Sequence, residues 1–216
     1  MRAITKLPEP NSLTQHRAQE HADYDNYADK ERLRGQLVEE QRELCCYCTG
    51  RIRAAGNRMK IEHWHSQNGF PNEQLLYGNM LGACLGNEGQ PLDRQHCDTR
   101  KGNQRMSRNP ANREHRIESF IHYGLDGSVS STDPDLNDEI NQVLNLNLPF
   151  LKENRKAALD AFKSGLEKRG HLGDEQLDRL LNVWSGNQPG ALDPFAPVIV
   201  FWLRKRQRQE PGSSTR

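Results

Sequence analysis

The sequence predicts an α+β fold that is predominantly helical, with a small cysteine-containing core embedded among the helices. Three observations lead to this fold class. Apolar residues recur at helical spacing before residue 43 and again over most of the last third of the chain. Between these regions, short apolar stretches alternate with turns rich in Gly, Pro and Asn, which is typical of short strands. All five cysteines fall in this middle region.

The composition limits how much stability a hydrophobic core can supply. The chain has 216 residues, of which only 34% are hydrophobic, and its mean hydropathy is -0.94. Charged residues make up 27%, an ordinary share, so wholesale disorder is not predicted. A thin core favours additional stabilisation by a bound metal ion or a protein partner.

The first part of the chain, residues 1–43, is predicted to be an arm followed by a helix. The first twenty residues carry Pro8 and Pro10 and are expected to be extended. From about His21 to Glu43, apolar residues recur on one side and charged residues fill the other, which predicts an amphipathic helix.

The second part, residues 44–116, is predicted to be the compact core. A cysteine turn ends the preceding helix, and residues 60–64 form a short strand. Residues 75–77 then lead into the apolar stretch after Asn79. A short helix is expected to begin near Asp98, with this residue close to its N-terminus.

The third part, residues 117–209, is predicted to hold a hairpin and a helical region. A strand is expected over residues 117–121, before an Asp126–Gly127 turn. Helices are expected over residues 136–144, 151 to about 168, and 174–184 with Asp174 as N-cap. The apolar run 195–203 is too short to span a membrane, so both core packing and partner docking are open. Residues 210–216 are predicted to be a disordered tail.

The cysteine spacing predicts a structural zinc site. Cys45 and Cys48 form a Cys-x-x-Cys pair, and Cys84 and Cys97 can complete a tetrahedral set. Disulfides and redox chemistry are the alternatives. No apolar leader opens the sequence, so a reducing cytoplasmic location is expected, where clustered cysteines more often bind metal. Cys46 is expected to be a small apolar residue outside the site.

Polar residues of a second kind are interleaved with these cysteines. Glu62 and His63 lie fifteen residues after the first pair, and Asn79 and Asp98 follow. Histidine suits a general base near neutral pH, and carboxylates suit Mg²⁺ or Mn²⁺. Adjacent residues on a strand face opposite sides, so a bend is needed for Glu62 and His63 to act together. His65 is an alternative base, whereas His96 is an alternative zinc ligand.

Basic residues concentrate after the last cysteines although the net charge is only +1. Seven Lys or Arg residues lie between Asp93 and Arg116, against three acidic residues. A solvated surface is the simplest explanation of such a run. Next to a metal site, the run instead favours contact with nucleic acid.

These motifs, in this order, resemble the HNH endonuclease family with its ββα-metal site. More narrowly, the chain resembles the PtuB-type nuclease subunits of Septu and some retron anti-phage systems. The likeness rests on residues 1–6 (MRAITK), 44–48 (LCCYC), 61–63 (IEH), 77–80 (YGNM) and 96–102 (HCDTRKG). The specific motifs cover residues 45–101, and the helical remainder matches loosely.

The resemblance implies a role for each motif residue. His63 matches the general base, and Asn79 matches the residue that orients it. Glu62 and Asp98 match the ligands of a catalytic Mg²⁺ or Mn²⁺, although Asp98 stands where many members carry His or Asn. The implied zinc ligands are Cys45, Cys48, Cys84 and Cys97, the last two thirteen positions apart. Lys101, with Arg100 and Arg105, is expected to contact substrate phosphate.

The resemblance also implies a function and partners. The expected activity is metal-dependent hydrolysis of phosphodiester bonds, in DNA rather than RNA, by the effector subunit of an anti-phage complex. The expected partners are a PtuA-like ABC-type ATPase and, in a retron, a reverse transcriptase with its RNA and DNA; no membrane association is expected. The alternative function is a non-catalytic, zinc-stabilised module that binds nucleic acid or the ATPase.

Overall fold

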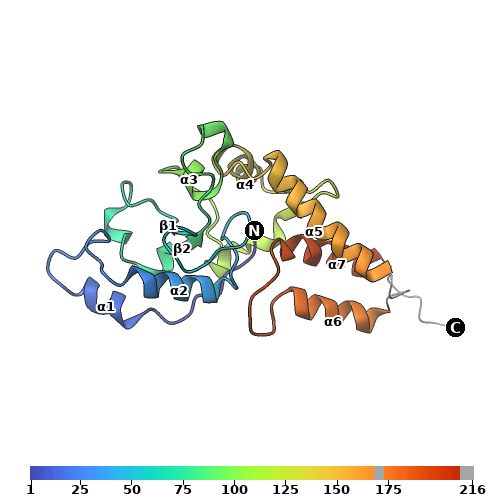
Figure 1. Cartoon of the computed structure of the whole chain (residues 1–216), viewed down its shortest axis with the longest axis horizontal. Coiled ribbons are helices and arrows are strands. Elements are labelled where there is room, and N and C mark those ends of the chain that lie inside the picture. Colours follow the sequence, from blue (N-terminus) through green and yellow to red (C-terminus); the bar gives the residue numbers. More distant parts are fainter. Residues whose placement is uncertain (168–172, 210–216) are drawn as a thin grey trace.

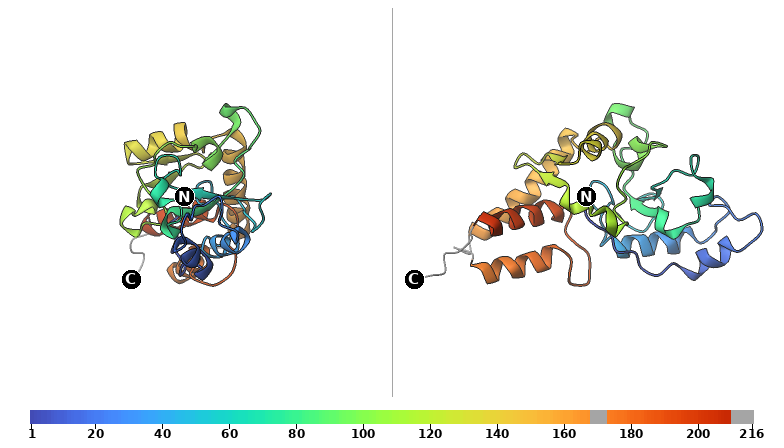
Figure 2. Two further views of the ribbon diagram at one scale, coloured as in Figure 1. Left: turned by 90° about the vertical axis from the view of Figure 1, so that its left-hand side faces the viewer. Right: turned by 180° about the vertical axis from the view of Figure 1, so that it is seen from behind.

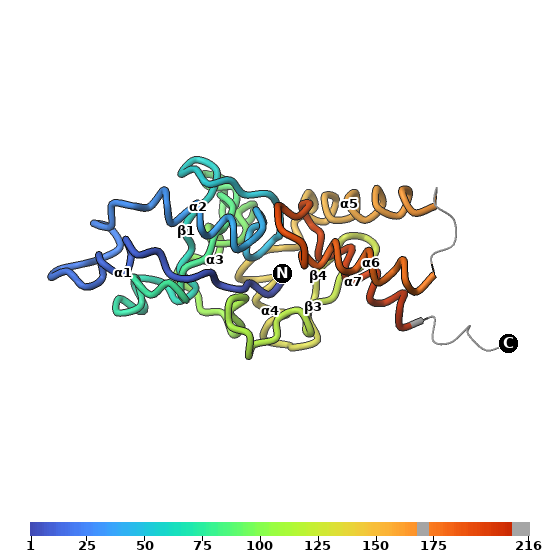
Figure 3. Tube along the Cα trace, turned by 90° about the horizontal axis from the view of Figure 1, so that it is seen from below, coloured from blue at the N-terminus to red at the C-terminus, as the bar shows by residue number. Residues whose placement is uncertain are grey.

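The computed structural model describes residues 1–167 and 173–209, and the chain has an α+β fold that is largely helical (Figure 1). Helices α1 and α2 and the β1–β2 sheet lie at one end of an elongated molecule. Helices α5, α6 and α7 gather at the other end (Figure 2). The N-terminal segment runs between these two groups (Figure 3). The predicted tail, residues 210–216, lies outside the described residues.

The N-terminal part differs from its prediction. Within the first twenty residues, α1 spans Asn11–Arg17, whereas an extended arm was expected. Pro10 precedes the first turn, where its fixed φ suits a helix start, and Leu13 is fully buried. The helix predicted from about His21 to Glu43 is shorter at both ends, and His21, Arg42 and Glu43 have φ values of 61°, 57° and 63°, which an α-helix does not contain. Helix α2 therefore spans Lys30–Glu40.

The middle part forms two strands followed by a helix. Strand β1 (Lys60–His63) pairs antiparallel with β2 (Met80–Ala83), with Glu62 opposite Leu81 and His63 opposite Met80, so the expected bend does not interrupt the ladder between Glu62 and His63. Helix α3 spans Cys97–Lys101, so the short helix predicted near Asp98 is confirmed. Helix α2 packs against β2. Short 3₁₀ turns connect these elements, at Pro71–Glu73, Tyr77–Asn79 and Leu92–Arg94.

The predicted hairpin exists, but its first strand is displaced along the chain. Residues 117–120 do not form a strand, because Ile117–Ser119 is a 3₁₀ turn that follows the turn Arg113–His115 and a left-handed Arg116. Strand β3 spans Ile121–Tyr123 and pairs with β4, Val129–Ser131. Gly127 has a φ of 81° at the turn, as the Asp-Gly pair predicts.

The last third is helical, as predicted. Helix α4 (Pro134–Asp138) continues into a π-helical turn, Glu139–Val143. Helix α5 spans Pro149–Glu167. Residue 168, at which the predicted helix ended, lies outside the described part. Helix α6 spans Asp174–Trp184, which matches its predicted bounds, but its N-cap is Gly173 rather than Asp174. Helix α7 spans Ala196–Gln209.

Two hydrophobic clusters hold these elements together. The larger one reaches from Met1 to Leu151, so the predicted segments 1–43 and 44–116 share one core. The smaller one joins α5, α6 and α7. The apolar run 195–203 contributes Val198, Ile199 and Leu203 to this smaller cluster, which decides for core packing at these positions. No helix within the described ranges is long and apolar enough to cross a bilayer.

The packing of α7 generates a stability prediction. Leu203 is fully buried between α7 and its neighbours, so Leu203→Ala should leave a cavity and lower the free energy of unfolding by about 2–5 kcal/mol. Leu125→Ala is the matched control, because Leu125 is 66% exposed, and it should cost no more than about 0.5 kcal/mol. Urea unfolding of both variants measures the difference. Equal costs would contradict the assignment of α7 to the core.

Candidate metal centres

Four cysteine side chains from three separate segments converge on one point. Cys45 and Cys48 lie in the turn that the Leu44–Arg51 bridge closes, Cys84 follows β2, and Cys97 begins α3. Their sulfur atoms all lie within 4.8 Å of one another. The Sγ–Sγ distance is 3.9 Å between Cys45 and Cys97 and 3.7 Å between Cys48 and Cys84.

These separations fit a tetrahedral metal ion. Zinc binds thiolate sulfur at about 2.3 Å, which places two sulfurs of a tetrahedron about 3.8 Å apart. Backbone amides support the sulfurs, since Cys84 N lies 3.3 Å from Cys45 Sγ and Gly50 N lies 3.4 Å from Cys48 Sγ. The cluster can therefore hold a structural metal such as zinc, and the wide spacing of Cys84 and Cys97 is no obstacle.

The thiol of Cys46 and the imidazole of His96 do not belong to the four-sulfur cluster. Cys46 is a free, fully buried thiol that does not belong to the four-sulfur cluster, and burial raises its pKa well above the ordinary value. His96 Nδ1 lies 3.1 Å from Cys97 Sγ and 3.9 Å from Cys84 Sγ. His96 therefore contacts the cluster from outside, with four sulfurs already in place.

The structure brings Glu62 and Asp98 together. Glu62, in β1, is 2% exposed, and its Oε1 accepts the hydroxyl of Tyr47 at 2.6 Å. The ammonium of Lys101 lies 2.9 Å from the same oxygen. Burial, and then the neighbouring Asp98 carboxylate, raise the pKa of Glu62 well above its ordinary value. Two adjoining carboxyl groups are a suitable partial ligand set for a hard divalent cation.

The carboxylate pair is a sparser site than the sulfur cluster. Among the described residues, the four cysteines are the only group of three or more His, Cys, Asp or Glu ligand atoms lying together. A divalent ion at Glu62 and Asp98 would therefore keep much of its hydration shell, which is usual for Mg²⁺.

The ring of His63 is held in one tautomer. Its Nε2 lies 2.9 Å from the carbonyl oxygen of Gln74, and its Nδ1 lies 3.1 Å from Nε2 of Gln67. Because a carbonyl can only accept, His63 Nε2 carries the proton and Nδ1 presents its lone pair. Tyr24 contacts the ring edge-on, at 4.5 Å between centroids. His63 is 5% exposed, and burial lowers its pKa.

Asn79 holds the loop that follows His63. Its Oδ1 accepts the backbone amide of His65 at 2.7 Å, and its Nδ2 donates to the carbonyls of His65 and Glu73. Its own carbonyl accepts the amide of Trp64. Asn79 therefore fixes the backbone just after His63 and the backbone at Glu73, the residue before Gln74. It makes no hydrogen bond to the His63 ring itself.

The three predicted substrate contacts are placed differently from one another. Lys101 is 1% exposed, and its ammonium also donates to the carbonyl of His63 at 3.1 Å, so it lies inside the site rather than on a substrate-facing surface. Arg100 is half-buried and donates to the carbonyl of Leu92 at 2.8 Å. Arg105 is exposed, with its guanidinium 4.9 Å from the ring centroid of Phe70.

His65, the alternative base, belongs to a different group of residues. Its Nδ1 lies 2.7 Å from Glu73 Oε2, and its ring stacks on Phe70 at 4.1 Å between centroids. Trp64 lies against the ring at 4.1 Å. The ring is thus held by one carboxylate and two aromatic neighbours, apart from the Glu62–Asp98 pair.

Three participants were not predicted from the sequence: Tyr47, Gln67 and Gln74. Tyr47 lies between two cysteines of the turn, so its position in that motif was the available signal. Gln74 acts through its backbone carbonyl, which carries no sequence signal. Gln67 is four residues after His63, in a loop whose path depends on Asn79.

The comparisons with known proteins assign no family: no family model matches the chain, and no curated protein matches it.

The sulfur cluster generates a prediction about metal content. Purified protein should bind one zinc ion per chain, and Cys48→Ser should lose most of it, because three sulfurs leave the tetrahedron open. Cys46→Ser is the matched control, since it removes a buried thiol outside the cluster, and its zinc content should equal that of the wild type. Elemental analysis of both proteins gives the answer. Equal zinc in both variants would refute the four-cysteine site.

Proposed function

We propose that the chain is a metal-dependent endonuclease of the HNH class that hydrolyses phosphodiester bonds of nucleic acid, DNA rather than RNA. One observation carries the proposal. A histidine whose Nε2–H is held by the Gln74 carbonyl, which leaves Nδ1 as the basic nitrogen, directly follows a buried carboxylate that has a second carboxylate beside it. Hydrolysis of a phosphodiester needs both a base for water and a cation at the phosphate.

The proposed chemistry at His63 follows from its tautomer. Nδ1 takes a proton from a water molecule, while Nε2 remains bonded to the Gln74 carbonyl, so the imidazolium that forms is already oriented. The water oxygen bonds to phosphorus as the bond to the leaving oxygen breaks, and the leaving oxygen gains a proton from solvent. Gln67 has to release Nδ1 for water to reach it.

Glu62 and Asp98 would hold Mg²⁺ or Mn²⁺, which would supply positive charge to neutralise the phosphate as the bond breaks. The ammonium of Lys101 already offsets part of the negative charge of the buried pair, so it would have to move away from Glu62 Oε1 for a cation to bind at that oxygen. The zinc site supports the cation role: Cys97 precedes Asp98 and fixes the start of α3 next to the sheet that carries Glu62. Arg100 and Arg105 are more exposed than Lys101, so they are the better candidates for contact with substrate phosphate.

The biological setting is proposed from the motif resemblance alone. The chain would be the effector subunit of an anti-phage complex with a PtuA-like ABC-type ATPase, and in a retron also with a reverse transcriptase and its nucleic acids. Since residues 195–203 are largely core, the ATPase would dock on another surface. Co-purification of the two subunits, followed by cleavage assays with and without ATP, tests this setting.

A second candidate function is a zinc-stabilised binding module without catalysis. It is favoured by the direct ion pair between Lys101 and Glu62, because a buried carboxylate already paired with a cation can be purely structural. Plasmid nicking that requires Mg²⁺ or Mn²⁺ decides between the two candidates.

The base assignment leads to a mutational prediction. His63→Ala should reduce cleavage by about a hundredfold to ten-thousandfold, the usual contribution of a general base, and leave the zinc content unchanged. His21→Ala is the matched control, because the His21 side chain is 89% exposed and far along the chain from the site. Initial rates on plasmid DNA with Mn²⁺ measure both. Wild-type rates in His63→Ala would sink the assignment, and a loss confined to His65→Ala would transfer the role to His65.

The burial of His63 leads to a prediction about pH. Its pKa lies below the ordinary value of 6.5, so the base form persists as the pH falls through 6.5, and the acid limb of kcat/KM should lie below that pH. The lowered pKa of His63 also affects folding. It contributes to the free energy of unfolding above pH 6.5, and this contribution is lost as the pH falls through the folded-state pKa. A rate profile at saturating Mg²⁺ checks the position, and a limb at or above 6.5 would contradict it.

A further inference from the structure

A groove runs along α7 where this helix faces β3 and the turn before it. Its volume is about 800 Å³. Ile121 and Phe201 form apolar walls, and the positively charged groups that line it are Arg116, Arg204, Lys205 and Arg208. We call this surface the α7 groove. It is formed by residues that lie outside the two metal centres.

The charge of the α7 groove is strongly asymmetric. Four cations line it, and Glu118 is the only acidic residue among the described residues that do so. Glu118 is already paired with Arg204 at 3.3 Å. No ion pair within the described part of the chain involves Arg116, Lys205 or Arg208. Since the whole chain has a net charge of only +1, this concentration of positive charge is local.

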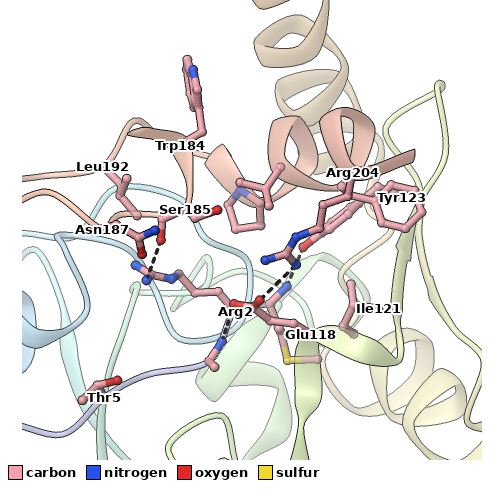
Figure 4. Close-up of a pocket in the computed structure, with 15 residues that line it drawn as sticks. Arg2, Thr5, Glu118, Ile121, Tyr123, Trp184, Ser185, Asn187, Leu192 and Arg204 are labelled. Atoms are coloured by element: carbon pink, nitrogen blue, oxygen red, sulfur yellow. Dashed lines mark hydrogen bonds and ion pairs between the residues drawn. The ribbon is translucent and has the colours of Figure 1, made fainter. Parts of the chain in front are cut away.

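A second cavity of about 270 Å³ adjoins the α7 groove and shares Glu118, Ile121 and Arg204 with it (Figure 4). Arg2 lies in this inner cavity, where one guanidinium nitrogen donates to the carbonyl of Ser185 at 3.4 Å. The other terminal nitrogen, Nη1, is buried and has no hydrogen-bond partner among the described residues. The wall of this inner cavity therefore contains a buried guanidinium N–H whose hydrogen bond is not satisfied.

The α7 groove is connected to the catalytic residues by the basic segment that the sequence singled out. Arg116 follows the turn Arg113–His115. The His115 ring lies 6.0 Å from that of Trp64, which comes directly after His63. The turn that precedes Arg116 therefore packs beside the residue that follows His63.

We infer that the α7 groove binds the phosphate backbone of the same nucleic acid strand that the Glu62–His63 site cuts, several nucleotides away from the scissile bond. This inference rests on the proposed function. Arginine and lysine neutralise successive phosphates, and the exposed ring of His122, beside the half-buried ring of Phe201, offers a face on which an unpaired base can stack. The contact between the turn before Arg116 and Trp64 favours nucleic acid over an acidic peptide, which would need only the local charge of the groove.

The test is a salt titration of binding to a fluorescein-labelled single-stranded DNA of about 20 nucleotides, a length that exceeds one ordinary binding site. Fluorescence anisotropy is measured in EDTA, so that no cleavage occurs. The variant is the full-length triple substitution Arg116→Gln, Lys205→Gln and Arg208→Gln. Each lost phosphate contact on a single strand lowers the slope of log K against log salt by about 0.7, so three contacts should lower it by about 2. Affinity at low salt should fall on the order of tenfold to a hundredfold.

The matched control is the triple substitution Arg32→Gln, Lys156→Gln and Arg179→Gln, which removes three exposed cations outside the α7 groove. Its slope should stay near that of the wild type. Equal losses in both triple variants, an unchanged slope in the groove variant, or no binding by the wild type would overturn the inference. So would a groove variant that loses binding to poly-glutamate but keeps its DNA slope.

The same proteins separate this inference from the proposed function. If the wild type binds DNA through the α7 groove but does not cut it with Mg²⁺ or Mn²⁺, the nuclease proposal fails and the groove assignment stands. If the groove variant cuts and binds like the wild type, the groove assignment fails and the nuclease proposal stands.

Discussion

Four sulfur atoms from three parts of the chain lie within 4.8 Å of one another, and the rest of the candidate site depends on this convergence. The cluster ties the turn after α2 to the end of β2 and to the start of α3. Helix α3 is only five residues long, too short to be stable by itself, so its position has to come from tertiary contacts. Fixing Cys97 fixes Asp98, and this brings a carboxylate of α3 to Glu62 of β1. A metal ion bound by the sulfurs would add its binding free energy to a hydrophobic core that is thin for this chain length.

Burial sets the electrostatics of the second centre. An isolated carboxylate at the position of Glu62 would be costly, and Tyr47 and Lys101 offset that cost by a hydrogen bond and an ion pair to the same oxygen. The neighbouring Asp98 acts in the opposite direction and raises the pKa of Glu62. A bound cation would reduce the electrostatic repulsion between the two carboxylates, so this arrangement favours cation binding. His63 is buried as well, and its neutral form is favoured by the same loss of solvation.

The features that the sequence by itself determined are those that depend on neighbouring residues. The Cys-x-x-Cys spacing limits two thiolates to one turn. The Asp126–Gly127 pair supplies a residue that tolerates positive φ, and Gly127 adopts it. The helical spacing of apolar residues predicted both ends of α6 correctly, because the apolar face of this helix packs against α7. The interleaving of Glu62 and His63 with the cysteines identified the candidate site, since residue type and order are properties of the chain alone.

Only the tertiary structure decided which of these groups meet and which are buried. Lys101 has the same charge as an exposed lysine, yet its side chain points inward to Glu62, and no local pattern specifies that direction. Asn79 braces the loop at His65, and Gln67 reaches His63, through contacts that exist only once β1 and β2 have paired. The α7 groove likewise combines residues from three distant segments, so its charge is invisible in a net charge of +1. Spacing along a chain limits which residues can meet. Packing in three dimensions selects the partners, and by excluding water it disfavours the charged forms of buried groups and so shifts their pKa values.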